Sequence, residues 1–171
     1  MTAIAGTLYC ICGKIAAGKT SLARKLAAEH AAVLICEDEW LVRIEAEIET
    51  FDDSCKHARR LRAAIGPHVI DLLRLGISVV LDMPVNTPRD RAWMRSLFEA
   101  ASAGHELHVI EATDELCKAR LRARNETMPE GLYFGHVPEE IFDPVTSLLV
   151  PPSEAEGFNL VSHRAQPDQR G

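Results

Sequence analysis

Eight residues near the start of the chain, from Gly13 to Thr20, have the types and spacing that suit binding of a polyphosphate. They match every fixed position of the pattern G-x-x-x-x-G-K-[ST]. Gly13 and Gly18 let the main chain turn tightly and direct its N–H groups inward, which forms an anion-binding concavity. We expect Lys19 to reach the β- and γ-phosphates and Thr20 to hold Mg²⁺ through its hydroxyl. The sequence therefore predicts a nucleoside triphosphate, ATP, as the ligand of this loop.

The segments on either side of the loop have the patterns that such a site requires. Residues 8–12 are apolar and predict a short buried strand, while residues 21–28 predict a helix with Leu22 and Leu26 on one face. The helix would add the positive end of its dipole and its unpaired N–H groups to the site. The residues predicted to contact the nucleotide are Gly13, Lys14, Ala16, Ala17, Gly18, Lys19, Thr20, Ser21, Arg120 and Arg124.

Two aspartates follow apolar runs that read as strands. Asp38 comes after residues 32–36, and Asp82 comes after residues 77–81. Ligands of α/β proteins bind at the carboxyl ends of parallel strands, so both side chains should lie near the phosphates. We expect Asp38 to be the base that accepts a hydroxyl proton and Asp82 to help place Mg²⁺. Glu37 is the alternative base; a helix N-cap and a turn-forming carboxylate are the alternative roles of Asp38 and Asp82.

Arginines gather at the end of a later predicted helix, in the run 120–124. Arg120 and Arg124 are four residues apart and share one helix face, whereas Arg122 points elsewhere. Paired guanidinium groups can stack on adenine and bind transferring phosphate oxygens, so we expect Arg120 and Arg124 to act in catalysis together with Lys19 and Asp38. The alternative is a favourable interaction with the helix C-terminus.

Other basic residues follow the third predicted strand or lie on the second long predicted helix. Each group could bind an acceptor that carries phosphate, or form an ordinary solvated helix face. The two groups are Arg89, Arg91 and Arg95, and Lys56, Arg59, Arg60 and Arg62.

Alternation of buried β-branched runs with helical patterns predicts an α/β fold with a parallel sheet. We expect a three-layer α/β/α sandwich with about five strands and a lid. The predicted strands are 8–12, 32–36, 77–81, 107–110 and 158–161. The predicted helices after the first are 40–50, 54–75 with an interruption at Gly66-Pro67, 88–104 capped by Thr87, and 113–125.

The length of 171 residues predicts one domain over residues 1–165, with a lid at about 125–138 and a flexible tail at 166–171. The net charge of −6 disfavours a general nucleic-acid coat protein. The longest uncharged stretch, residues 1–13, is too short to span a bilayer. Five irregularly spaced cysteines favour free thiols in a reducing cytoplasm. We expect a monomer or a homodimer.

The chain resembles the small P-loop kinases of the zeta-toxin, polynucleotide-kinase and chloramphenicol-phosphotransferase group. The resemblance rests on the loop at 13–20, the strand-end Asp38, the run 76–82 ending in Asp82, the arginine-rich run 120–125, and Pro151-Pro152 with residues 156–158. It implies that Asp38 is the catalytic base, that Lys19 and Thr20 serve ATP and Mg²⁺, and that Arg120 and Arg124 serve the nucleotide. Arg43 is the nearest candidate for the arginine that the group has soon after this acid.

The sequence thus predicts transfer of the γ-phosphoryl group of ATP to a hydroxyl of a small molecule or a nucleotide. The acceptor is not defined by the resemblance, because members of the group phosphorylate very different molecules. Two alternatives stay open. One is a nucleotide-dependent switch or ATPase without an acceptor, and the other is a polynucleotide 5′-hydroxyl kinase.

Overall fold

The computed structural model describes residues 5–44, 46–127 and 136–166. Its centre is a five-stranded sheet in the order β2-β3-β1-β4-β5, and every neighbouring pair of strands is parallel. The strands are β1 (Thr7–Cys12), β2 (Val33–Cys36), β3 (Val79–Pro84), β4 (Gly104–Glu111) and β5 (Leu160–Arg164). This arrangement confirms the predicted α/β class and the parallel sheet of about five strands.

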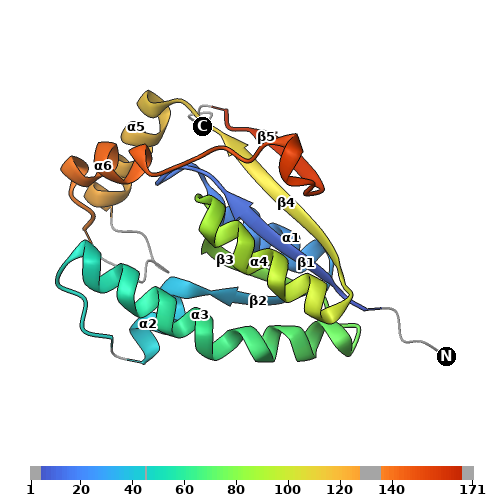
Figure 1. The fold of residues 1–171 in the computed structure, drawn as a ribbon. Helices are drawn as coiled ribbons and strands as arrows, with labels where there is room; N and C mark the ends of the chain where they lie inside the picture. Colours follow the sequence, from blue (N-terminus) through green and yellow to red (C-terminus); the bar gives the residue numbers. More distant parts are fainter. Residues whose placement is uncertain (1–4, 45, 128–135, 167–171) are drawn as a thin grey trace.

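Helices cover both faces of the sheet (Figure 1). Helix α1 (Lys19–Glu29) packs on one face against β1, β2 and β3. Helices α3 (Phe51–Arg74) and α4 (Pro88–Ala101) pack against each other on the opposite face. Two buried apolar clusters result, one on each side, and the side chains of β1 alternate between them: Leu8 and Cys10 face α3 and α4, whereas Tyr9 and Ile11 face α1. The sheet is therefore buried on both faces, as its continuous apolar strands require.

Helix α2 (Glu37–Arg43) begins directly after β2 and is shorter than predicted. The sequence pattern predicted a helix over 40–50, but the observed helix starts three residues earlier and ends at Arg43. Asp38 consequently lies in its first turn, and Cys36 is the N-cap residue. The alternative role of Asp38, that of a helix N-cap, is therefore wrong.

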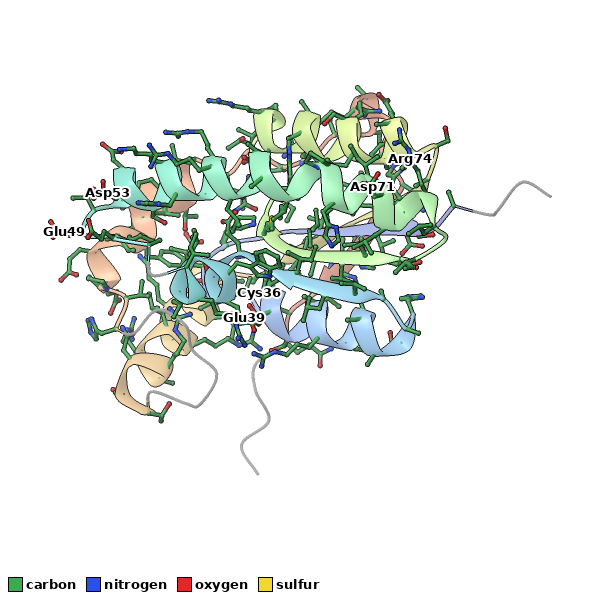
Figure 2. The ribbon with its side chains drawn as sticks, turned by 90° about the horizontal axis from the view of Figure 1, so that it is seen from below. Cys36, Glu39, Glu49, Asp53, Asp71 and Arg74 are labelled. Atoms are coloured by element: carbon green, nitrogen blue, oxygen red, sulfur yellow. The ribbon has the colours of Figure 1, made fainter. Side chains whose placement is uncertain are left out.

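Helix α3 also differs from its prediction, because it starts at Phe51 and runs without interruption past Pro67. Thr50 caps it, four residues before the predicted start of the helix: the Thr50 side chain accepts from the main-chain N–H of Asp53, and the Asp53 carboxylate accepts from that of Thr50. Figure 2 shows Asp53 at the start of this helix and Asp71 and Arg74 at its end. Tertiary packing on the sheet overrides the local cost of a proline in the helix.

Strand β3 runs past its predicted end and contains Asp82, which pairs in register with Cys36 of β2. Its register with β1 is irregular here, because Cys10 pairs with Leu81 but Ile11 pairs with Pro84. Such a bulge re-aims the side chains beside it. The predicted cap of α4 by Thr87 is present as a capping box, but Ser102 in a left-handed conformation ends the helix and Gly104 begins β4.

After β4 the chain forms α-helices at the carboxyl ends of the strands and then rejoins the sheet as β5 (Figure 1). This part of the chain contains α5 (Asp114–Thr127), the short 3-10 helix η1 (Glu139–Ile141), α6 (Phe142–Ser147) and a second 3-10 helix η2 (Glu154–Glu156). Most of the predicted lid and nearly all of the predicted tail lie outside the described residues. None of the helices within the described ranges is long and apolar enough to cross a membrane.

Candidate active site

The glycine-rich loop joins the end of β1 to the start of α1 and has the special main-chain geometry that its sequence predicts. Gly18 is the N-cap residue of α1 with a φ of 105°, a left-handed conformation that favours glycine. Gly13 approaches β4 so closely that an added Cβ would lie 3.3 Å from the Cβ of Ile110. Ala16 also has a positive φ, of 57°. The loop is therefore tightly turned, and the first N–H groups of α1 are free of helical partners.

Lys19 folds back over the loop. Its Nζ donates to the carbonyl oxygens of Gly13 at 2.8 Å and Lys14 at 2.6 Å. Burial lowers the pKa of this ammonium, while the nearby carboxylates of Asp82 and Asp38 act in the opposite direction. The Lys19 ammonium thus lies between the loop carbonyls and two acids. There it could donate to phosphate oxygens in place of the two carbonyls.

Lys14, another predicted nucleotide contact, braces the loop from outside. Its Nζ donates to the carbonyl oxygen of Ala112 at 2.9 Å and to Asp114 Oδ1 at 2.5 Å. Asp114 is the first residue of α5, so the ion pair ties the loop to that helix. The charge of Lys14 is therefore compensated within the protein by Asp114.

Asn86 is a site residue that sequence reasoning missed. Its Oδ1 accepts from the N–H of Gly13 at 2.9 Å, and its Nδ2 donates to the carbonyl oxygen of Gly13 at 3.1 Å. The main-chain carbonyl of Asn86 also accepts from the N–H of Val150, at 2.9 Å. Asn86 therefore fixes the first glycine to the segment after β3. The only signal in the sequence was an amide residue four positions after Asp82.

Three carboxylates gather beyond Lys19 at the carboxyl ends of β2 and β3. Asp38 is exposed to solvent, but surrounding protein atoms desolvate its carboxylate, and Glu37 and Asp82 add negative charge, so its pKa rises to about 6. Lys19 and Arg124 partly offset this rise. Asp82 is 9% exposed, and its Oδ2 has no hydrogen-bond partner among the described residues. A carboxylate with a pKa near neutrality is suited to accept a proton.

The two predicted catalytic arginines both project from α5 toward this region. Arg120 Nη1 donates to the carbonyl oxygen of Ala17 at 3.3 Å, and Nη2 donates to that of Gln166 at 2.9 Å. Burial lowers the pKa of Arg124, while Asp38 acts to raise it. The Nε atom of Arg124 is buried without a hydrogen-bond partner in the described structure. Arg122 points elsewhere, as predicted, and pairs with Glu139 at 3.0 Å.

The structure brings most of the predicted site residues together. The charges of Lys19, Asp82 and Arg124 all act on Asp38. Both acids act on Lys19 as well, and Arg120 contacts the loop. Thr20 and Ser21 are exposed in the first turn of α1. Arg43, the candidate for the arginine that follows the strand-end acid, is not part of this group. It pairs with Glu39 at 2.7 Å, and its side chain is 73% exposed.

Several arginines that the sequence offered either as acceptor ligands or as a solvated helix face contact other parts of the protein instead. Arg91 is fully buried and pairs with Glu156 through two hydrogen bonds of 2.7 and 2.9 Å. Arg95 donates to the main-chain carbonyl of Glu156 and lies 4.4 Å from the ring centroid of Phe158. Arg62 pairs with Glu37 at 2.8 Å. Arg59, Arg60 and Arg89 are exposed.

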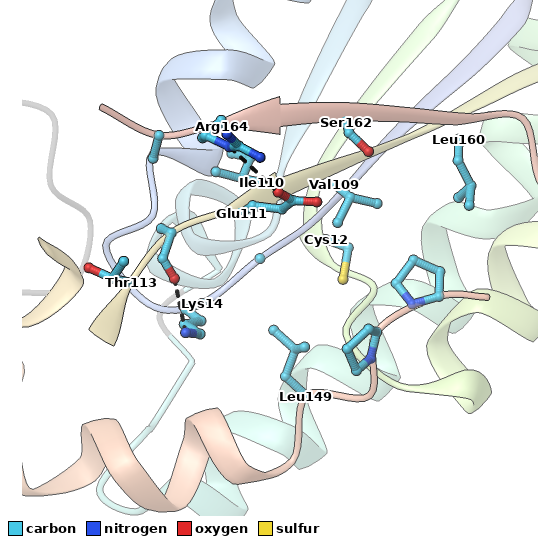
Figure 3. Close-up of a pocket in the computed structure, with 15 residues that line it drawn as sticks. Cys12, Lys14, Val109, Ile110, Glu111, Thr113, Leu149, Leu160, Ser162 and Arg164 are labelled. Atoms are coloured by element: carbon cyan, nitrogen blue, oxygen red, sulfur yellow. Dashed lines mark hydrogen bonds and ion pairs between the residues drawn. The ribbon is translucent and has the colours of Figure 1, made fainter. Parts of the chain in front are cut away.

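A cavity of about 660 Å³ lies beside the loop (Figure 3). Three of its lining residues, Cys12, Val109 and Leu160, belong to the apolar cluster on the side of α3 and α4. The cavity walls are mostly apolar and include Cys12, Val109, Leu149 and Leu160. The charged groups at its rim pair with protein, as in the contact from Lys14 to the carbonyl of Ala112. Asp38, Asp82 and Arg124 are not among its lining residues. This cavity is therefore distinct from the cluster of charged residues.

A family model described as an AAA domain matches residues 8–152 of the chain, from β1 to the segment that precedes η2. The chain belongs to this AAA domain family. The match includes the glycine-rich loop, all three carboxylates and both arginines of the site. A search of curated proteins finds no match for the chain.

Solved structures share the fold of this AAA domain protein. A candidate kinase of Chloroflexus aurantiacus J-10-fl has a TM-score of 0.75 at 18% identity, over 100% of this chain and 91% of that one. Kti12 of Chaetomium thermophilum, solved with ADP-AlF3, has a TM-score of 0.72 at 18% identity, over 95% and 91%. A gluconokinase of Sinorhizobium meliloti has a TM-score of 0.59 at 17% identity, over 98% and 86%. The predicted resemblance to small P-loop kinases is confirmed for the fold.

Proposed function

We propose that this protein transfers the γ-phosphoryl group of ATP to a hydroxyl of a small molecule or a nucleotide. The proposal rests on the environment of Asp38: its carboxylate has a pKa of about 6, and the charges of Lys19 and Arg124 act on it. A base of this kind accepts a proton from a hydroxyl as that hydroxyl attacks phosphorus. The names of similar structures, a candidate kinase and a gluconokinase, support the same reaction class.

The remaining site residues would bind and neutralise the phosphates. Main-chain N–H groups of the loop and of the first turn of α1 would cradle them, and Lys19 would bind the β- and γ-phosphates. Arg124, whose buried Nε atom has no protein partner among the described residues, would bind an oxygen of the transferring group. Arg120, which already contacts the loop at Ala17, would bind the nucleotide. The complex of Kti12 with ADP-AlF3 supports a nucleotide as the ligand of this fold.

The acids of the site suit Mg²⁺. Among the described residues no group of three or more His, Cys, Asp or Glu forms a metal site by itself. Mg²⁺ in phosphate sites keeps several waters and needs only one or two protein ligands beside the phosphates. The unpartnered, buried Oδ2 of Asp82 and the hydroxyl of Thr20 would provide or orient these ligands. When bound, the ion would neutralise charge on the β- and γ-phosphates.

A transfer assay tests the proposal. The protein is incubated with Mg²⁺, ATP labelled at the γ-phosphate, and panels of nucleosides, sugars, antibiotics and 5′-hydroxyl oligonucleotides. We expect label to appear on one class of hydroxyl compound and to disappear in Lys19→Ala. Release of inorganic phosphate that no acceptor changes would contradict a kinase and favour an ATPase or switch. Labelling of oligonucleotides alone would identify a polynucleotide kinase.

A further inference from the structure

Arg62 lies in the middle of α3, and its side chain makes several contacts although the proposed phosphoryl transfer gives it no role. Its Nε donates to Glu37 Oε2 at 2.8 Å, and its Nη1 donates to Asp90 Oδ1 at 2.9 Å. Its Nη2 donates to the carbonyl oxygen of Pro84 at 3.2 Å. The guanidinium also lies 5.4 Å from the ring centroid of Trp93. The side chains of Arg62 and Glu37 are only 14% and 9% exposed, so this junction is largely shielded from water.

The junction connects the elements that carry the acids of the site. Glu37 precedes Asp38 in the first turn of α2. Pro84 follows Asp82 by two residues, at the end of β3. Asp90 belongs to the capping box of α4, where its other oxygen accepts from Thr87. One guanidinium therefore fixes α2, the end of β3 and the start of α4 relative to one another.

Helix α2 depends on such a contact because it is weak by itself. It has seven residues, fewer than an isolated helix needs to be stable. No side chain caps its N-terminus, although acids fill its first turn. Glu37 is buried, and a buried carboxylate without a partner is strongly unfavourable. The ion pair with Arg62 thus stabilises Glu37 in its buried position and holds α2 against α3.

We propose that Arg62 is a positioning residue: it anchors Glu37 and thereby holds Asp38 in place opposite Lys19 and Arg124. The inference rests on the proposed function for the role of Asp38. It differs from the acceptor-binding role that the sequence suggested for Arg62, because all three nitrogens of the guanidinium already donate to protein oxygens.

The proposal has an electrostatic consequence that packing alone would not have. The charged groups that act on Asp38 are Glu37 and Asp82, which raise its pKa, and Lys19 and Arg124, which lower it. In the native protein the charge of Glu37 is compensated by Arg62. Removal of that compensation leaves a full negative charge beside Asp38, and a like charge disfavours ionisation. The pKa of Asp38 should then rise further.

Carboxyl ¹³C NMR titration of the full chain tests this directly and does not depend on phosphoryl transfer. The Asp38 resonance is assigned by its loss in Asp38→Asn. We expect a midpoint near pH 6 in the native protein and an increase of about 1 pH unit in Arg62→Met, the lower end for a neighbouring charge. Arg62→Lys keeps the charge and should recover most of the native value. Once an acceptor is known, the acid limb of turnover should shift in the same direction.

Two controls make the result decisive. Arg74→Met removes the same charge from the same helix, about 18 Å along its axis, and should leave the midpoint unchanged. In the Glu37→Gln background the neighbouring charge is already absent, so adding Arg62→Met should no longer raise the midpoint. If Arg62→Met alone fails to fold, the proposal requires the double variant to fold, because no unpaired carboxylate remains. An unchanged midpoint in folded Arg62→Met, an equal rise in the Glu37→Gln background, or a double variant that also fails to fold would overturn the proposal. If the Asp38 midpoint shifts as predicted but the transfer assay detects no phosphorylated acceptor, the proposed kinase activity is refuted. The anchoring role of Arg62 is then still supported.

Discussion

Arg91→Met is expected to lower the stability of the protein substantially. The Arg91 side chain is fully buried and donates to both carboxylate oxygens of Glu156, at 2.7 and 2.9 Å. It also donates to the carbonyl oxygens of Val150 at 2.9 Å and Val85 at 3.3 Å. Methionine fills similar space but makes none of these contacts. The substitution therefore removes the arginine donor from two carbonyls and leaves the Glu156 carboxylate, among the described residues, with only the N–H of Ser153, between α4 and the segment that leads to β5.

The expected loss is about 3 kcal/mol in the free energy of unfolding. Removal of one partner of a buried ion pair costs roughly 3–5 kcal/mol. The lower end applies here because the Glu156 side chain is 27% exposed and water can reach it after the change. For a chain of 150–250 residues each kcal/mol corresponds to about 2–4 °C, so Tm should fall by roughly 6–12 °C.

Urea unfolding and thermal denaturation at neutral pH measure this loss. The double variant Arg91→Met/Glu156→Gln should recover part of it, because no uncompensated carboxylate remains. The hydrogen bonds from Arg91 hold the pKa of Glu156 below its usual range. The contribution of the pair should therefore be present above the ordinary glutamate pKa and disappear as pH falls through the lower native pKa. A loss below 1 kcal/mol, or no recovery in the double variant, would refute the reasoning.

Three further outcomes follow from the structure. Asn86→Ala removes both side-chain hydrogen bonds to Gly13 and should cost about 1–2 kcal/mol in stability and weaken ATP binding; unchanged calorimetric affinity would contradict the role of the amide. Asp38→Asn should bind ATP normally but transfer phosphoryl groups at least about 100-fold more slowly, and full activity would move the base elsewhere. Burial lowers the pKa of His108, so stability should fall as pH drops below about 6.5, and His108→Gln should flatten this dependence in urea unfolding.

Local patterns in the sequence were enough to predict the fold. The runs before and after the glycine-rich loop correctly predicted β1 and α1, because loop, strand and helix signals agree within about twenty residues. Thr87 was predicted as a cap because it stands directly before Pro88 at the start of a helical pattern, and the structure adds Asp90 as its capping partner. The family match and the similar structures confirm the P-loop fold that these local signals predicted.

Features that depend on contacts between distant residues could not be predicted in this way. Asn86 is 73 positions from Gly13, and Arg91 is 65 positions from Glu156. Nothing in either local sequence identifies the partner. Arg91 is also buried, whereas the sequence pattern predicted that the cluster to which it belongs would face solvent or bind a ligand. The end of β3 was misplaced for a related reason, since pairing with β2 draws Asp82 into the strand.

The central claim is that the loop of residues 13–20 binds ATP through Lys19, and isothermal titration calorimetry tests it most directly. A non-hydrolysable ATP analogue with Mg²⁺ is titrated into the native protein, into Lys19→Met and into Lys25→Met, an exposed lysine of the same helix. We predict binding at one site in the native protein and in Lys25→Met, with affinity at least about 10-fold weaker in Lys19→Met, the effect of losing one charged hydrogen bond. Equal affinity in all three proteins, or no binding by the native protein, would contradict the account.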